Sequence, residues 1–263
     1  MAENVLLLGA NGFIGRKIVD LVDSKYRIIP VKRDLQRKQA FLEENRPIAI
    51  INCAASDHNA GLDDSLLVNI DYPLKWLEAL QRSANLEIKW IQAASYYELQ
   101  IPYGRKDFYS IHKMEFRTNL LSAMKSSNFE PIVVFLPHIF GEGQKPTSLL
   151  PSLIRYLREG DELNLTTGRQ FLPLLHVDDA ARALIQAIHS GQETCSAYPI
   201  WYGKVLDLIL EIESLFNVRI SPSNMSNVSV DERFPKINFP KAVDGWSASI
   251  SIENYLESIL RNN

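Results

Sequence analysis

A glycine-rich segment close to the amino terminus constrains the fold of this chain more than any other feature. Gly9, Gly12 and Gly15 follow directly on the apolar run at residues 5–8. A short run without polar residues is typical of a parallel strand that is buried on both faces. After the glycines, apolar residues recur at positions 14, 18, 21 and 22, which is the spacing of one face of an amphipathic helix. The segment therefore predicts a tight turn that joins a buried strand to a helix.

A buried strand, a glycine turn and a helix, in this order, form the phosphate-binding part of a Rossmann-type fold. Glycine lacks the Cβ atom that would keep a pyrophosphate away from the backbone, and the amino end of the helix attracts phosphate. An ordinary turn is the alternative, but the flanking strand and helix provide the context that dinucleotide binding requires. We therefore expect a dinucleotide cofactor at this turn.

The first half of the chain alternates short apolar runs with helical patterns, as βαβ units do. Further strands are predicted at residues 27–31, 49–53, 89–93 and 131–136, with helices from residue 73 and at residues 109–125. The stretch between the second strand and Ile48 is short, so we expect the third strand of the usual fold to be reduced or missing.

The pattern changes after Gly141, where prolines, glycines and polar residues suggest an inserted lobe. Helices are predicted at residues 149–158, 177–188 and 250–260, with a loop-rich tail at residues 221–246. We predict an α/β fold, with a Rossmann-type doubly wound parallel sheet and a small C-terminal substrate-binding lobe. Residues 1–137 and 173–200 are assigned to the Rossmann domain, and residues 138–172 and 201–263 to the lobe.

Composition excludes several classes of function. The net charge of -3 and the pI near 6.0 argue against nucleic acid or an anionic membrane as the main partner. The first apolar run ends before Gly9, and a run of this length is too short for a signal peptide or a membrane span. The two cysteines form no CxxC pair and the five histidines form no cluster, so we expect neither a disulfide framework nor a metal site. We expect a cytoplasmic protein.

The end of the second predicted strand indicates which nicotinamide cofactor is used. NAD-preferring sites usually place an acidic residue there, to bind the ribose 2′-hydroxyl. Here Lys32 and Arg33 occupy that point, and Asp34 comes one or two residues late. Two cations favour a 2′-phosphate, so NADP(H) is favoured over NAD(H). The alternative is that Lys32 and Arg33 belong to a solvated loop.

Ser95, Tyr109 and Lys113 are the candidate catalytic residues. Tyr109 is the only one of ten tyrosines with a lysine four residues later, and residues at this spacing share a helix face. An adjacent ammonium and the positive nicotinamide ring favour the phenolate and lower the pKa of a tyrosine, which suits Tyr109 as a proton donor to a carbonyl oxygen. Ser95 would polarise that oxygen, and Lys113 would also hold the nicotinamide ribose.

These residues together resemble the extended short-chain dehydrogenase/reductases, in the group of NAD-dependent epimerases and dehydratases. The similarity runs nearly from end to end. Besides the glycine turn and the tyrosine–lysine pair, it rests on Asn52-Cys53-Ala54-Ala55, Asn69-Ile70-Asp71, residues 136–141, His176-Val177-Asp178-Asp179 and Gly245-Trp246. We interpret the His176–Asp179 segment as structural, because capping and local ion pairs explain it.

The resemblance implies a set of binding residues. Those expected at the cofactor are Gly9, Asn11, Gly12, Phe13, Ile14, Gly15, Lys32, Arg33, Ala54, Ala55, Asn69, Lys113 and Ile139. Those expected at the substrate are Tyr97, His138, Arg169 and Arg233.

Within the group, residues 165–170 and His138 are most similar to 4-ketoreductases of nucleotide-linked 6-deoxyhexoses. The resemblance implies NAD(P)H-dependent reduction of such a 4-keto sugar, in nucleotide-sugar biosynthesis for surface polysaccharide. The chain departs from the family in a short span from Ser95 to Tyr109 and in Leu172, where many epimerases carry an arginine. The acidic pair that dehydratases use beside the serine is also missing.

Two alternatives stay open. The same residues would serve a nucleotide-sugar epimerase with tightly bound NAD, or a protein that binds a dinucleotide as a sensor without turnover. A homodimer through the helix that carries Tyr109 is possible, with Leu120, Leu121 and Met124 at the contact. Those three residues could equally belong to the core.

Overall fold

The structure is a computed structural model that describes the chain except for residues 1, 84–85, 125–128, 223, 226–229 and 261–263. Six parallel strands form the main sheet in the order β2-β1-β3-β4-β5-β9. They are β1 (Glu3–Leu8), β2 (Tyr26–Val31), β3 (Ala49–Asn52), β4 (Ile88–Ser95), β5 (Phe129–Leu136) and β9 (Thr194–Ser196). The prediction of a Rossmann-type parallel sheet is confirmed.

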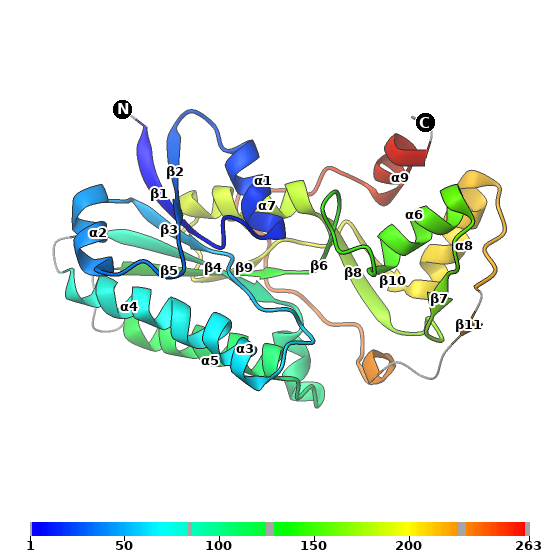
Figure 1. Cartoon of the computed structure of the whole chain (residues 1–263), viewed down its shortest axis with the longest axis horizontal. Coiled ribbons are helices and arrows are strands. Elements are labelled where there is room, and N and C mark those ends of the chain that lie inside the picture. The colour runs from blue at the N-terminus through cyan, green and yellow to red at the C-terminus, as the bar shows by residue number, and fades with distance from the viewer. Residues whose placement is uncertain (1, 84–85, 125–128, 223, 226–229, 261–263) are drawn as a thin grey trace.

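Helices cover both faces of this sheet (Figure 1). On one face lie α1 (Phe13–Leu21) and α7 (Val177–Gln186), and on the other lie α2 (Lys38–Asn45), α3 (Leu62–Leu66), α4 (Tyr72–Arg82) and α5 (Phe108–Ala123). Alternate side chains of the buried strands supply the two cores, with Val5 and Leu7 on one face and Leu6 and Leu8 on the other. This two-sided burial explains why β1 contains no polar residue between Val5 and Leu8.

The edge of the sheet confirms that the third strand of the usual fold is missing. Within the described residues, β2 is the edge strand, and the chain returns from it through α2 directly to β3. Strand β3 pairs with β1 on the side opposite β2. The direction of the connections therefore reverses between β1 and β3, and the carboxyl ends of strands at such a point border the ligand crevice of open α/β sheets.

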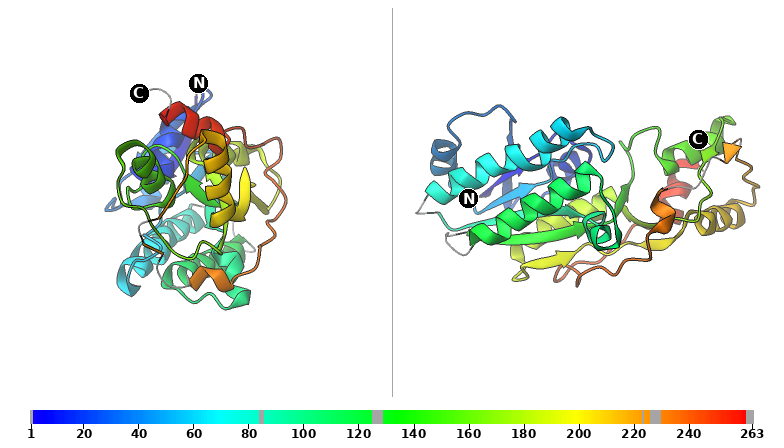
Figure 2. Two further views of the ribbon diagram at one scale, coloured as in Figure 1. Left: turned by 90° about the vertical axis from the view of Figure 1, so that its right-hand side faces the viewer. Right: turned by 90° about the horizontal axis from the view of Figure 1, so that it is seen from below.

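A second, smaller group of elements extends from the carboxyl edge of the sheet (Figures 1 and 2). It contains the three-stranded sheet β10-β8-β6 and the helices α6 (Leu149–Glu159), α8 (Val205–Phe216) and α9 (Ile252–Leu260). The strands are β6 (His138–Phe140), β8 (Phe171–His176) and β10 (Trp201–Lys204), and β7 (Asn164–Leu165) pairs with β11 (Asn224–Met225). These elements enclose a core of their own around Phe140, Leu153 and Leu256. The predicted domain boundaries stay a prediction.

Short helical segments complete the chain. They are the π-helical turn η1 (Leu67–Asp71) between α3 and α4, and the 3-10 segments η2 (Glu98–Tyr103), η4 (Ala187–His189) and η5 (Val230–Arg233). The predicted helix 109–125 begins at Phe108, where the Asp107 carboxylate accepts a hydrogen bond from the Ser110 N–H at 2.9 Å. Its predicted end, Lys125, lies outside the described residues. Within those residues, no helix combines the length and the apolarity that crossing a membrane requires.

Candidate active site

Close packing requires glycine at two positions of the first turn, Gly9 and Gly15. Gly9 has a φ of +87°, and a Cβ atom on it would lie 2.6 Å from the Ala54 backbone nitrogen. A Cβ atom on Gly15 would lie 2.1 Å from the Gly9 carbonyl oxygen, closer than any real contact allows. Gly12 is the N-cap of α1, and its N–H donates to the Gly9 carbonyl at 2.9 Å. The backbone therefore forms an open cradle at the amino end of a helix, which is where a pyrophosphate binds.

A groove of about 960 Å³ lies over this cradle. Its lining includes Lys32, Arg33 and Asp34 at the end of β2, so cations and a carboxylate face it side by side. The predicted cofactor residues that line it are Gly9, Asn11, Gly12, Phe13, Ile14, Lys32, Arg33, Ala54 and Ala55. The size, the glycine cradle and the cations fit a nicotinamide dinucleotide.

Four predicted cofactor residues do not line this groove: Gly15, Asn69, Lys113 and Ile139. Gly15 acts through the packing of α1 on the turn, because its missing Cβ lets the helix approach Gly9. The buried Asn69 side chain accepts a hydrogen bond from the Ser56 N–H at 3.2 Å and donates to the hydroxyls of Ser56 and Ser65. Asn69 therefore holds the loop after β3 in place, and Ser56 of that loop faces the groove.

Ser95 is the last residue of β4, and a tight turn fixes its orientation. Its N–H donates to Glu98 Oε1 at 2.8 Å, and its Oγ accepts a hydrogen bond from the Tyr97 N–H at 3.2 Å. A side-chain hydrogen bond joins Ser95 to Tyr109 of α5. After the turn, the segment Glu98–Tyr103 coils as η2.

Tyr109 and Lys113 meet Ser95 from α5. Tyr109 packs edge-on against Tyr97, with ring centroids 6.4 Å apart. Burial raises the pKa of Tyr109, a hydrogen bond with Ser95 opposes this, and the charges of Glu98, Tyr97 and Asp107 add to it. In the protein by itself, burial outweighs the other effects. The lower pKa expected from Lys113 together with a bound nicotinamide stays a prediction. A raised pKa keeps the phenol protonated at neutral pH, as a proton donor must be.

Lys113 is buried, and its Nζ donates to the Ala93 carbonyl of β4 at 2.6 Å. Burial lowers the pKa of Lys113, while the nearby Glu98 and Cys53 oppose the shift. Cys53 lines the cofactor groove, so Lys113 lies near a residue of that groove.

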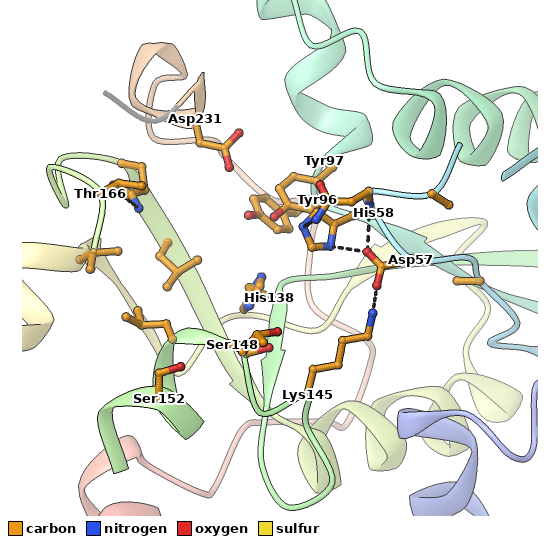
Figure 3. A pocket seen from close by; sticks show the side chains of 18 of the residues that line it. Asp57, His58, Tyr96, Tyr97, His138, Lys145, Ser148, Ser152, Thr166 and Asp231 are labelled. Atoms are coloured by element: carbon orange, nitrogen blue, oxygen red, sulfur yellow. Dashed lines mark hydrogen bonds and ion pairs between the residues drawn. The ribbon is translucent and has the colours of Figure 1, made fainter. Parts of the chain in front are cut away.

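A second cavity, of about 940 Å³, lies between the sheet edge and the small lobe (Figure 3). Tyr97 and His138, both predicted substrate residues, line it. It shares part of its lining with the cofactor groove, namely Arg33, Ala55, Ser56, Asp57 and Lys145. Asp57 forms an ion pair with Lys145 at this shared border, and its Oδ1 lies 3.4 Å from Nδ1 of the neighbouring His58, as Figure 3 shows. A ligand in the cavity would therefore adjoin a dinucleotide in the groove.

Arg105 connects the two halves of the cavity. Its guanidinium lies 3.6 Å from the centroid of the Tyr97 ring, and its Nη1 donates to Asp231 of η5 at 2.9 Å. It also donates from Nε to Asp107 at 2.5 Å. Asp231 lines the cavity from the lobe side, so this arginine links that wall to the tyrosine wall.

His138 faces His58 and Asp231 in the cavity. Burial, together with the charge of His58, lowers the pKa of His138 to about 4, and Asp231 opposes this shift. His138 is therefore neutral near pH 7, able to donate from one ring nitrogen and accept at the other.

The other two predicted substrate residues lie elsewhere. Arg169 and Arg233 are exposed, and neither lines the cavity. Their neighbours do so instead, because Gln170 and Asp231 point inward from the same segments. The resemblance located the right segments but not the side chains that face inward.

Three charged or titratable residues of the cavity lining were not predicted from the sequence: Asp57, His58 and Lys145. Asp57 and His58 follow β3, whose carboxyl end belongs to the ligand-binding edge of the sheet, and that position was the available signal. Lys145 follows Gly141 and Gly143, both with positive φ, and no local pattern connects it with Asp57, 88 residues earlier.

The His176–Asp179 segment is structural. His176 caps α7 by accepting from the Asp178 N–H at 3.2 Å. The fully buried Asp179 accepts hydrogen bonds from Arg182 and from the N–H groups of Ser249 and Ile250.

Comparison with known proteins agrees with this arrangement. The profile of the NAD dependent epimerase/dehydratase family matches residues 5–198. CDP-abequose synthase from Salmonella muenchen is 21% identical, over 98% of this chain and 97% of that protein. The structure of UDP-glucose 4-epimerase from Thermotoga maritima with UDP-glucose has a TM-score of 0.83 at 19% identity, covering 98% of this chain and 97% of that chain. RMD from Pseudomonas aeruginosa, complexed with NADPH, has a TM-score of 0.74 at 16% identity, covering 99% and 98%.

Proposed function

This chain belongs to the NAD dependent epimerase/dehydratase family, and on that premise we propose that it reduces the 4-keto group of a nucleotide-linked 6-deoxyhexose with NADPH. The observation that carries the proposal is the meeting of Ser95, Tyr109 and Lys113 at the carboxyl end of β4. They lie beside Tyr97 of the substrate cavity and Cys53 of the cofactor groove. The similarity to CDP-abequose synthase over nearly the whole chain supports the choice of substrate class.

Each of the three catalytic candidates has a separate role in the proposed reduction. A bound nicotinamide cofactor supplies the hydride. Tyr109, held protonated by its raised pKa, donates its proton to the carbonyl oxygen of the substrate. Ser95 donates a hydrogen bond to the same oxygen. Lys113 holds the nicotinamide ribose and stabilises the phenolate that Tyr109 becomes.

The contacts of Glu98 argue against dehydratase activity. A dehydratase needs an acidic side chain that exchanges protons with the sugar. The Glu98 carboxylate has no exposed surface and is bound by Arg117 and the Ser95 N–H. A carboxylate with both oxygens engaged in this way does not reach the substrate.

The test is oxidation of NADPH and of NADH, followed optically, with CDP-, dTDP-, GDP- and UDP-linked 4-keto-6-deoxyhexoses. We expect NADPH consumption with one of these substrates and a reduced sugar in the product. Flat traces for all four, with cofactor binding measurable by fluorescence, would refute the reductase for these substrates.

One observation favours a second candidate, an epimerase with tightly bound NAD. Asp34 lines the cofactor groove next to Arg33, and a carboxylate there can bind the ribose 2′-hydroxyl of NAD. NADPH preference follows from Lys32 and Arg33, which line the same groove. NAD that co-purifies with the protein, and no net NADPH oxidation, would favour the epimerase.

We also propose that the protein is cytoplasmic and that it forms a homodimer. Apolar side chains on α3, η1 and the start of α5 are partly exposed: Leu62, Leu66, Leu67 and Phe108. Leu120, one of the residues considered for a dimer contact, is fully buried in the core. We place the contact at the exposed set, and the molar mass in solution tests it.

A further inference from the structure

A buried carboxylate beside the catalytic serine is unexplained by the chemistry above. Glu98 is the first residue of η2, and its side chain has no exposed surface. Its Oε1 accepts the Ser95 N–H at 2.8 Å, and its Oε2 accepts from Arg117 Nε at 2.8 Å. Removing a carboxylate from water is costly unless hydrogen bonds and a counter-ion replace the water. Here the Ser95 N–H supplies the hydrogen bond and Arg117 supplies the counter-ion, and both lie next to the proposed catalytic residues.

Arg117 connects this carboxylate to the helix that carries the tyrosine. Tyr109, Lys113 and Arg117 are spaced by four residues along α5, so they follow one another on one face of the helix. The Arg117 guanidinium also lies over the Phe135 ring of β5, 5.4 Å from its centroid. Packing on both sides therefore limits how far the guanidinium can move.

The chain of contacts runs from one proposed catalytic group to the other. Ser95 is held at its N–H by Glu98 and at its Oγ by the Tyr97 N–H. Glu98 is held by Arg117, and Arg117 extends from the same helix as Tyr109. The turn after β4 and helix α5 are thus joined two helical turns beyond the tyrosine.

We propose that Glu98 and Arg117 form a positioning clamp that fixes the Ser95 hydroxyl relative to the Tyr109 hydroxyl. The inference rests on the proposed function, in which both hydroxyls must reach one substrate oxygen. Neither residue of the clamp touches substrate. A displacement of the Ser95 turn relative to α5 lowers the rate of proton transfer without weakening the binding of either ligand.

The charge of Glu98 in the clamp also affects the pKa of Tyr109, which can be measured. The groups that face Tyr109 are Ser95, Tyr97 and Glu98 from the turn, Asp107 at the start of α5, and Lys113 on the same helix face. Among these, Glu98 raises the pKa of Tyr109. Neutralising Glu98 therefore makes Tyr109 more acidic.

A second buried pair provides a matched control. Asp179 is fully buried, accepts backbone N–H groups and pairs with Arg182 at 2.9 Å, as Glu98 does with Arg117. It ties the segment at Ser249 and Ile250 to α7, on the opposite face of the sheet from α5. Asp179→Asn therefore measures what the loss of such a pair does to the fold alone.

The first experiment compares steady-state kinetics of Glu98→Gln and Asp179→Asn with the wild type. For Glu98→Gln we expect kcat to fall on the order of tenfold, as for a lost hydrogen bond to a charged group. KM for the sugar and for NADPH should stay within about twofold, since binding is unaffected. Asp179→Asn should keep kcat at temperatures where it is folded. Equal losses of kcat in the two variants, or a Glu98→Gln effect confined to KM, would overturn the clamp.

The second experiment needs no substrate. 3-Fluorotyrosine, which is more acidic than tyrosine, replaces Tyr109, and its ionisation is followed by ¹⁹F NMR. We expect its midpoint to move to lower pH with Glu98→Gln and to stay unchanged with Asp179→Asn. An unchanged midpoint in Glu98→Gln would overturn the proximity on which the clamp rests, even if the wild type reduces none of the sugars tested. If Glu98→Gln does not fold, the double variant Glu98→Gln/Arg117→Met removes both charges and is judged by the same two measurements.

Discussion

The cofactor groove and the substrate cavity adjoin each other, yet they are built in different ways. The groove is shaped by backbone, through three glycines within seven residues and a helix that starts at the turn. The cavity is shaped by side chains from the loop after β3, the turn after β4, β6, the loop before α6 and η5. Two ion pairs join segments around it, Arg105 with Asp231 and Asp57 with Lys145.

This difference determines how each region tolerates change. A backbone cradle fails when a single Cβ atom is added, because the obstructing atoms belong to the fold itself. A cavity lined by paired side chains from separate segments can exchange one residue and keep its volume. The groove therefore suits a common cofactor, and the cavity suits substrates that vary among relatives.

We expect the largest loss of activity from a substitution of Tyr109, which lies between the groove and the cavity. Tyr109→Phe removes the proton donor and should lower turnover by about 10²- to 10⁴-fold, with NADPH binding kept. The exposed Tyr103 provides the control, since Tyr103→Phe should retain full turnover. An unaltered rate in Tyr109→Phe would contradict the catalytic role of this tyrosine.

The next effect tests the backbone cradle. Gly9→Ala places a Cβ atom 2.6 Å from the Ala54 nitrogen at a φ of +87°. Overpacking of this kind costs roughly 1–3 kcal/mol, and NADPH affinity measured by fluorescence titration should fall in proportion. Gly191→Ala is the matched control, because a Cβ there meets nothing within 4 Å. Equal affinities for the two variants would mean that the cradle does not bind the cofactor.

A smaller effect is expected on the pH dependence of stability, through His138 of the cavity. Its folded pKa is lowered to about 4 from 6.5, so the unfolded chain takes up a proton first as the pH falls. Stability should be complete above pH 6.5 and decline toward pH 4, by on the order of 3 kcal/mol from this residue. His138→Asn should flatten that decline in urea titrations at several pH values. An equally steep decline in the variant would contradict the burial of a neutral imidazole.

The smallest effect is expected at the border of the two regions. Lys145 and Asp57 form an ion pair in which the lysine side chain is 68% exposed, and exposed pairs are worth at most about 1 kcal/mol. Lys145→Met should therefore change thermal stability by only a few degrees. A large loss of stability would show that the border, unlike the rest of the cavity, is required by the fold.

The sequence predicted the local features of the site well. The glycine turn, the strand before it and the spacing of Tyr109 and Lys113 depend on contacts within a few residues, and local patterns record such contacts. The exposed Arg169 and Arg233 show where this fails. In each case the segment was right, but the direction of neighbouring side chains was set by packing that local spacing does not report.

By itself, the sequence determined the parallel sheet and the cofactor cradle, because hydrophobic period and glycine spacing encode them directly. The short stretch after the second strand likewise indicated that the third strand is reduced or missing. Only the tertiary structure decided the border of the cavity, the raised pKa of Tyr109 and the Glu98–Arg117 pair. Each of these depends on burial and on groups that approach from distant parts of the chain, such as Asp57 and Lys145. Desolvation and contacts of this kind arise when the chain packs, so no local pattern contains them.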